Sequence, residues 1–300
     1  MDEISEKEQK SSAPKSINYY VIAAIFISVL LFTFANAIEP QINAQLDFFE
    51  LIFVLAYAAP AVFSFSVARK RWGSLVFGRA YLSLAIAYGL GAIGAALYDY
   101  YQMAGVDNPY PGIPDIFFFL YYIFAIIHLR INTRFGARLG AGGRLTRHQK
   151  MIIIIIPLAV TSIYAFGLLF APAISVTDSV PDDKEVFNLV PIFLENTRFD
   201  PLPESDPSFW KGYFAGIYFV AATTAVFAWA IVGAQVFRRS SQLGTPWALL
   251  IIGLGLNAVG DVSYYFTSIY SYDRTNPIIG VWVLGFMIVC YALYLHEKRV

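Results

Sequence analysis

Eight apolar runs, each close to 20 residues long, constrain this chain more than any other feature of its sequence. The runs cover residues 18–38, 49–68, 78–101, 114–131, 151–171, 209–236, 245–268 and 277–296. A helix of about 20 apolar residues crosses the roughly 30 Å hydrocarbon core of a bilayer. The pattern therefore predicts an all-α integral membrane protein with eight transmembrane helices. The first run exceeds the apolar core of a signal peptide, so we expect it to be a retained helix.

The composition excludes most other classes of protein. Hydrophobic residues make up 58% of the chain and charged residues 14%, with a mean hydropathy of +0.58, which a water-soluble fold does not accommodate. The formal net charge is zero, so no nucleic-acid partner is expected. A single cysteine, Cys290, lies inside an apolar run and excludes a disulfide framework or a thiolate metal cluster. The expected partner is the lipid bilayer, in the cell membrane.

Lysine and arginine fall mostly on one side of the predicted membrane. The connections after the second, fourth and sixth runs are basic, and so are both tails. Together they hold 17 of the 21 Lys and Arg residues; the exceptions are Lys184, Arg198, Lys211 and Arg274. Because cytoplasmic loops carry an excess of Lys and Arg, this side is predicted to be cytoplasmic, with both termini on it.

The first four runs resemble the last four. Aligning Gly94 with Gly260 places Tyr98 on Tyr264, and the run that follows ends with a histidine in each half. Four crossings per half give both halves the same orientation, which predicts two parallel repeats with any site between them. The alternative is that helices rich in Gly and Tyr resemble one another by composition alone.

The predicted repeats divide the chain as follows. Residues 1–17 form a cytoplasmic tail, and residues 18–150 form the first four-helix repeat, with a basic cytoplasmic loop at 130–150. Residues 151–300 form the second repeat, whose external loop at 172–208 is acidic and rich in proline. We expect this loop to be solvated rather than to bind calcium, because it lacks the ligand spacing of a calcium loop.

Asp261 is the strongest candidate for a functional residue. A carboxylate near the centre of a membrane helix costs about 2.5 to 3.5 kcal/mol and needs a partner or water. Asn257 precedes Asp261 by four residues and Tyr264 follows it by three, so all three lie on one helix face. This face is predicted to point into the bundle.

Other polar residues are predicted near the same external end. Tyr98 and Asp99 close the third run, and Asp115 opens the fourth. The sequence therefore predicts an external polar pocket between the repeats that takes a cation, a proton or a small polar ligand. Its candidate ligand-binding residues are Asp261, Asn257, Asp99, Tyr98, Tyr264 and Asp115. The alternative is structural, with Asp115 capping its helix, Asp99 solvated and the tyrosines in an interfacial belt.

No enzymatic motif, metal site or cofactor site is predicted. The sequence contains no HExxH motif, no GxSxG motif and no phosphate-binding loop. His128 and His296 end the fourth and eighth runs, where a histidine is ordinarily a solvated residue that complements the helix dipole. A haem or metal ion held between these two imidazoles is the less favoured alternative.

One stretch resembles a known family. It contains Tyr98-Asp99-Tyr100-Tyr101, Pro109-Tyr110-Pro111, Pro114-Asp115-Ile116-Phe117-Phe118 and Tyr121-Tyr122. This stretch, Gly94 to Leu129, resembles the multi-pass membrane sensor regions of prokaryotic histidine kinases and diguanylate cyclases. Gly260-Asp261 is similar to the Gly-Asp pair that those regions carry near the end of a helix.

The chain also departs from that family. Gly94 is followed by Ala95 where the family has Gly-Asp, and no kinase or cyclase output domain occurs by Val300. The resemblance therefore implies a stand-alone sensor-like protein that signals through a cytoplasmic or membrane partner. Two alternatives stay open: a small-solute or ion transporter with Asp261 as its coupling carboxylate, and an accessory subunit of a membrane complex.

Overall fold

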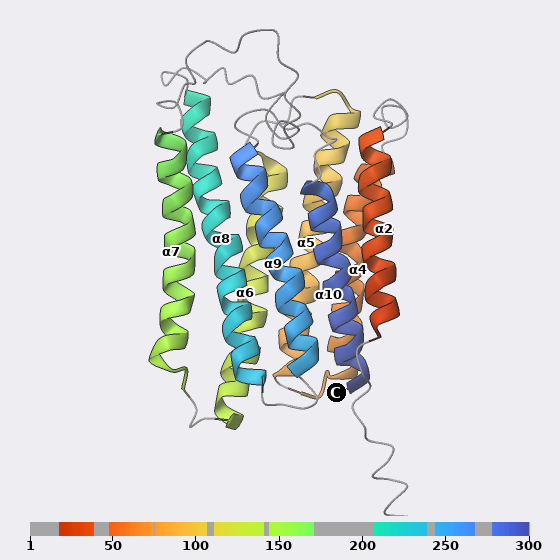
Figure 1. The fold of residues 1–300 in the computed structure, drawn as a ribbon, viewed down its shortest axis with the longest axis vertical. Helices are drawn as coiled ribbons and strands as arrows, with labels where there is room; N and C mark the ends of the chain where they lie inside the picture. Colours follow the sequence, from red (N-terminus) through yellow and green to blue (C-terminus); the bar gives the residue numbers. More distant parts are fainter. Residues whose placement is uncertain are drawn as a thin grey trace, which may run out of the picture.

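Eight helices make up the part of the chain that the structure describes. The computed structural model describes residues 18–38, 48–74, 76–106, 111–140, 144–170, 207–238, 244–267 and 278–299. The helices are α2 (Tyr19–Ile38), α4 (Phe48–Lys70), α5 (Phe77–Met103), α6 (Ile113–Gly140), α7 (Arg147–Phe170), α8 (Pro207–Phe237), α9 (Gly244–Thr267) and α10 (Ile278–Arg299), and they lie side by side in one bundle (Figure 1). The all-helical prediction is confirmed for these residues. The predicted tail (1–17) and nearly all of the acidic loop (172–208) lie outside them.

The lengths and compositions of these helices fit a multi-pass membrane protein. Seven of the described helices, α4 to α10, are long and apolar enough to cross a bilayer. In α2 the apolar segment Tyr19–Phe34 is shorter. Apolar residues surround these helices rather than forming one stripe, which is typical of helices that contact lipid on one side and protein on the other.

The predicted basic loop at 130–150 is largely helical. α6 continues to Gly140 and α7 begins at Arg147, so only a short connection separates them. Arg130, Arg134 and Arg138 follow one another at intervals of four residues along α6. Arginine is a good helix former and is favoured near a helix C-terminus, so the helix does not end where the apolar run ends.

Six helices form a closed ring. Extensive contacts join α4 to α5, α5 to α6, α6 to α8, α8 to α9, α9 to α10, and α10 back to α4. Most of the largest fully buried side chains lie on helices of this ring, among them Trp247, Tyr81, Tyr88, Phe286 and Leu84. Tyr164 of α7 is the exception, and it belongs to a smaller buried cluster with Tyr213 and Val220 of α8. The main core of the protein is therefore the interior of the six-helix ring.

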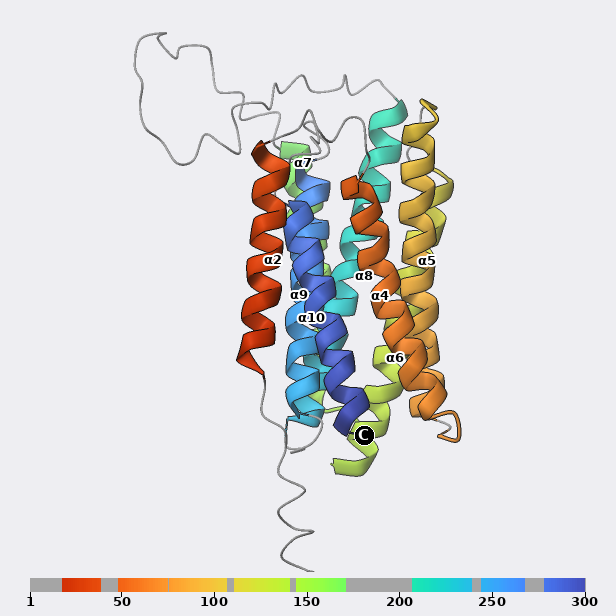
Figure 2. The same ribbon diagram turned by 90° about the vertical axis from the view of Figure 1, so that its right-hand side faces the viewer.

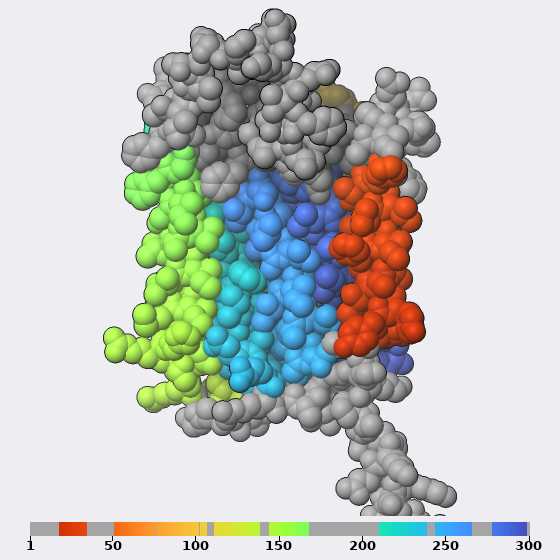
Figure 3. All heavy atoms as spheres, in the orientation of Figure 1, coloured from red at the N-terminus to blue at the C-terminus, as the bar shows by residue number. Residues whose placement is uncertain are grey.

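The helices α2 and α7 lie outside the ring. α2 packs on α10 and α7 packs on α8, and the two flank α8, α9 and α10 on the face shown in Figure 3. Only 6% of the membrane-spanning window of α7 is buried within the protein, against 61% for α10. α7 therefore presents most of its surface to lipid.

Small residues let α9 and α10 approach closely. A Cβ atom added to Gly253 of α9 would lie 2.8 Å from the backbone oxygen of Gly285 of α10. Such contacts are common in membrane proteins, where close packing replaces the hydrophobic drive for association. The close approach matters because each of these helices carries a residue of the candidate site.

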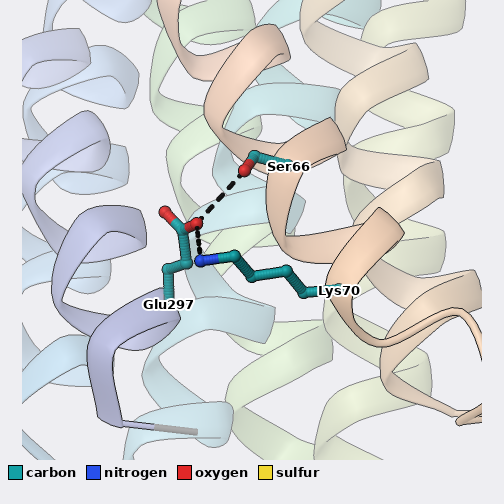
Figure 4. A network of polar contacts seen from close by, with 3 residues as sticks. All are labelled: Ser66, Lys70 and Glu297. Atoms are coloured by element: carbon teal, nitrogen blue, oxygen red, sulfur yellow. Dashed lines mark hydrogen bonds and ion pairs between the residues drawn. The ribbon is translucent and has the colours of Figure 1, made fainter.

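Most basic side chains of the described helices gather at one end of the bundle. We call this the basic end; α4, α6, α8 and α10 end there, and α2, α5, α7 and α9 begin there (Figures 1 and 2). There Lys70 of α4 forms an ion pair with Glu297 of α10, and Ser66 donates a hydrogen bond to the same carboxylate at 3.2 Å (Figure 4). At the start of α2, the backbone N–H of Asn18 donates to the Tyr291 hydroxyl at 2.9 Å.

Candidate functional site

Asp261 of α9 lies at the junction of four helices of the ring. Its side chain is buried, and three side chains bond its carboxylate. Tyr122 of α6 and Thr223 of α8 each donate to Oδ2 at 2.8 Å, and Trp282 of α10 donates its indole N–H to Oδ1 at 2.8 Å. We call Asp261, Tyr122, Thr223 and Trp282 the acid cluster. Both oxygens of the carboxylate are bonded, which meets the need that a charged group in a membrane has for partners.

The helices position the acid cluster by close packing. Asp261 lies six residues before the end of α9, about 9 Å from that end at 1.5 Å per residue. The neighbouring Gly260 makes room for the Trp282 ring, since a Cβ added at Gly260 would lie 2.6 Å from the indole nitrogen. A glycine at this position therefore lets the indole reach the carboxylate.

Aromatic rings enclose the acid cluster. Tyr122 lies against Phe219, with ring centroids 6.0 Å apart, and Trp282 lies 5.5 Å from Tyr264. Rings of this kind exclude water, so the hydrogen bonds to Asp261 form in an environment of low polarity, where they are stronger than in water.

The donors of the acid cluster differ in what they can do chemically. The indole N–H of Trp282 only donates, so Oδ1 must stay an acceptor while this bond exists. The hydroxyls of Tyr122 and Thr223 both donate and accept. A proton on Oδ2 of Asp261 would therefore still find a partner after one hydroxyl reverses its role. The arrangement suits a carboxylate that gains and loses a proton.

Asn257 lies one helical turn from Asp261, on the same face of α9, as predicted. It is buried, and neither polar atom of its amide has a hydrogen-bond partner among the described residues. The amide packs directly against Gly285 of α10. Asn257 thus points into the protein, beside the acid cluster rather than bonded to it.

Asp115 belongs to a second group near the same end of the bundle. Its Oδ1 accepts a hydrogen bond from Tyr98 at 2.9 Å, and its Oδ2 accepts one from the backbone N–H of Gly112 at 2.6 Å. Asp115 is the third residue of α6, and the bond back to Gly112 is that of a helix cap. This supports the capping interpretation.

The two remaining predicted site residues lie nearby. Asp99 is half-buried next to Tyr98 on α5. Tyr264 of α9 is partly buried and lies within electrostatic range of Asp115. The six predicted residues therefore occur as two neighbouring groups, one around Asp261 and one around Asp115, with Tyr264 between them.

The expectation that His128 and His296 are solvated is wrong. Both side chains are buried, with 0% and 3% of their surface exposed. Their rings pack against the ring of Tyr81, at centroid distances of 4.9 and 5.0 Å. Nδ1 of His128 lies 2.8 Å from the backbone oxygen of Ala80, and Asn132 contacts the same imidazole at 3.4 Å. We call Tyr81, His128, Asn132 and His296 the histidine cluster.

Neither cluster has the composition of a metal site. No group of three or more His, Cys, Asp or Glu side chains suited to a metal ion occurs among the described residues. The histidine cluster consists of two imidazoles, an amide and a phenol, none of which is an anion. A divalent ion bound there would have no negatively charged ligand within the membrane.

The predicted site residues do not include three members of the acid cluster, Tyr122, Thr223 and Trp282. Tyr122 stood out only as part of the family resemblance, while Thr223 and Trp282 were not singled out. Each lies in a transmembrane run and carries a hydrogen-bond donor. A search for donors in the runs on either side of the Asp261 helix would have found Thr223 and Trp282.

Comparison with known proteins adds no relative. No family model, no curated protein and no solved structure matches this chain.

Proposed function

We propose that this protein is a sensor-like integral membrane protein in which Asp261 is the switch. The observation that carries the proposal is the convergence of Tyr122, Thr223 and Trp282, from three helices, on one buried carboxylate of a fourth. Any change at this carboxylate, such as a gained proton or a bound cation, alters bonds to three helices at once. A local event is thereby coupled to the packing of the ring.

The arrangement of the ring supports the proposed pair of repeats. Suppose that α4, α5 and α6 of the first repeat correspond to α8, α9 and α10 of the second. The contacts α4–α5, α5–α6 and α6–α8 then correspond to α8–α9, α9–α10 and α10–α4, and all six contacts occur. Packing recurs as well, because Gly94 lies against Phe118 as Gly260 lies against Trp282. In this proposal all eight helices cross the membrane, both termini are cytoplasmic, and the acid cluster lies at the α6–α8 seam between the repeats.

The proposed signal passes from the external end to the cytoplasmic end. The acid cluster lies near the end opposite to the basic one, and the basic end is proposed to face the cytoplasm. A partner protein would read the rearrangement there, where α6 extends to Gly140 with Arg134 and Arg138 exposed.

Hydrogen–deuterium exchange in proteoliposomes tests this coupling. We compare the wild type with Asp261→Asn, which keeps the side-chain volume but replaces one acceptor oxygen with a donor group that opposes the existing donors. We expect faster exchange around the acid cluster and also in the basic-end segments of α6 and α8. Exchange that changes only within one turn of residue 261 would contradict the proposal.

Asp115→Asn provides the matched control. It makes the same chemical change at a carboxylate in the same part of the bundle. The Asp115 carboxylate accepts hydrogen bonds from the Tyr98 hydroxyl and from the backbone N–H of Gly112 at the helix cap. We expect its effect to stay local. An equal effect of both variants at the basic end would mean that Asp261 has no special role.

A transporter that couples to Asp261 is the second candidate. It is favoured by the position of the carboxylate at the seam between the proposed repeats, because transporters built from repeats bind their substrates there. The test is proton flux into proteoliposomes with an enclosed pH-sensitive dye and an imposed membrane potential. Flux that disappears in Asp261→Asn but persists in Asp115→Asn would favour the transporter over the sensor.

A further inference from the structure

The basic end of the ring contains buried polar atoms that the described residues do not satisfy. Nε2 of His296, Oδ1 of Asn132 and Oγ of Ser64 have no hydrogen-bond partner there. At most 3% of the surface of each of these residues is exposed. Buried polar atoms are nearly always hydrogen-bonded, to protein or to ordered water. Several such atoms at one end of a ring therefore indicate a bound molecule that supplies the missing hydrogen bonds.

The hydrogen bonds of His128 indicate what that bound molecule offers. Nδ1 of His128 faces the backbone oxygen of Ala80, which only accepts, so Nδ1 carries a hydrogen. In the neutral ring Nε2 is then an acceptor, and it faces Nδ2 of Asn132 at 3.4 Å. This leaves Oδ1 of Asn132 as an acceptor without a partner among the described residues. Water, which donates two hydrogen bonds and accepts others, suits such a set.

The unsatisfied atoms lie close to the basic end. His296 lies three residues before the end of α10, and Ser64 six residues before the end of α4, distances of about 5 and 9 Å along the helices. Ser66 bonds Glu297, the neighbour of His296, so Ser64 and His296 lie on adjoining stretches of two packed helices. Water needs to pass only one or two helical turns to reach them.

The contacts shown in Figure 4 link two helices at the basic end. Lys70 and Ser66 of α4 both bind the carboxylate of Glu297, and so join α4 to α10 at the surface beside His296. The Lys70 side chain is 60% exposed, so solvent competes for this ion pair. We call these three residues the α4–α10 latch.

We propose that Ser64, Asn132, His128 and His296 form a second, hydrated polar site in the ring, and that water enters it from the basic end through the α4–α10 latch. This site goes beyond the proposed function of Asp261. It gives the ring a water-binding site at the end opposite to the acid cluster.

Cysteine accessibility tests the proposal. Cys290→Ala removes the single native thiol, and Ser64→Cys then places a thiol of similar size in the proposed site. A membrane-impermeant cationic methanethiosulfonate is added to inside-out and to right-side-out vesicles. We expect Ser64→Cys to react from the side of the basic end, about tenfold faster than a thiol in the dry core, because buried polar sites hold water. Adding Glu297→Gln should raise that rate further, because it opens the latch.

Ala87→Cys provides the dry control. Ala87 is fully buried on α5, six residues deeper into the ring than Tyr81. Equal rates for Ser64→Cys and Ala87→Cys, with the latch intact and with it broken, would overturn the hydrated site. If Glu297→Gln did not change the reaction rate of Ser64→Cys, the proposal that water enters through the α4–α10 latch would be wrong.

Hydroxyl-radical footprinting of the unmodified protein gives a second measurement that does not depend on a variant. Radicals generated from water label side chains that contact ordered water. We expect stronger labelling of His296 and Tyr81 than of Phe286, which has no polar side-chain atom and lies ten residues deeper on α10 than His296. Labelling of His296 and Tyr81 that does not exceed that of Phe286 would contradict the proposal.

Discussion

The acid cluster and the histidine cluster occupy opposite ends of the same ring, and they satisfy their polar atoms differently. Both oxygens of Asp261 are bonded, by donors from three other helices. In the histidine cluster, by contrast, His296 Nε2 and Asn132 Oδ1 have no partner among the described residues. Both clusters are therefore buried, but the carboxylate of the acid cluster is fully hydrogen-bonded, whereas the histidine cluster contains polar atoms without a partner.

This difference indicates that the acid cluster stabilises the fold, whereas the histidine cluster needs a bound molecule such as water to complete its hydrogen bonds. Removing one member of a fully bonded buried group leaves the others without partners, which is costly. Removing an atom that has no protein partner leaves no protein group without a hydrogen bond. Substitutions should therefore be more costly at the acid cluster than at the histidine cluster, and the following predictions test this order.

The largest effect is expected for Asp261→Leu. The variant orphans the donors of Tyr122, Thr223 and Trp282 in a buried place, and we expect it to lower the free energy of unfolding by about 3 kcal/mol. Unfolding in mixed detergent micelles, followed by circular dichroism, measures the change. A variant more stable than the wild type would contradict this prediction and show that the buried carboxylate lowers the free energy of unfolding.

Gly260→Ala should have the next largest effect. The added Cβ would lie 2.6 Å from the indole nitrogen of Trp282, so the ring must move and its bond to Asp261 must lengthen or break. We expect a loss of about 1–2 kcal/mol of stability. Gly89→Ala is the control, since the added carbon would meet no atom within 4 Å apart from the adjoining backbone of its own helix. Equal stability of both variants would show that the close fit at Gly260 does not hold the indole in place.

The histidine cluster should respond unequally to two matched substitutions. His128→Phe removes the bond to Ala80, and we expect a loss of about 1 kcal/mol. His296→Phe removes an imidazole nitrogen without a protein partner, and we expect a loss of less than about 0.5 kcal/mol. Both variants keep a ring against Tyr81. A larger cost for His296→Phe would mean that its imidazole is held more firmly than that of His128.

The membrane character of the chain was predictable because it depends on local composition. A run of about 20 apolar residues spans a bilayer whatever its tertiary contacts are, and the helices from Phe48 to Arg299 follow the predicted runs. The ends were less predictable. α6 continues to Gly140 because arginines prolong a helix after hydrophobicity has ended.

The site was predictable only in part, because partners on other helices depend on packing. The burial of Asp261 and Asn257 follows from the cost of placing a polar group against lipid, and both point inward. Which helices face α9 does not follow from its sequence, so Thr223 and Trp282 were missed. His128 and His296 were misjudged because position near the end of a run indicates depth in the membrane, not the side of the helix that faces the ring.

The smallest effect is expected at the α4–α10 latch. Glu297→Gln removes the ion pair with Lys70, whose side chain is 60% exposed, and exposed pairs contribute only about 0.5 kcal/mol. The loss should be measurable at low salt and should vanish near 1 M salt, where the screening length is about 3 Å. Ser66→Ala is the control, because it keeps the ion pair and removes an uncharged donor, so its effect should not depend on salt. A cost of Glu297→Gln that stays the same at both salt concentrations would place the pair in a drier environment than its exposure indicates, and the latch would then contribute to stability as the acid cluster does.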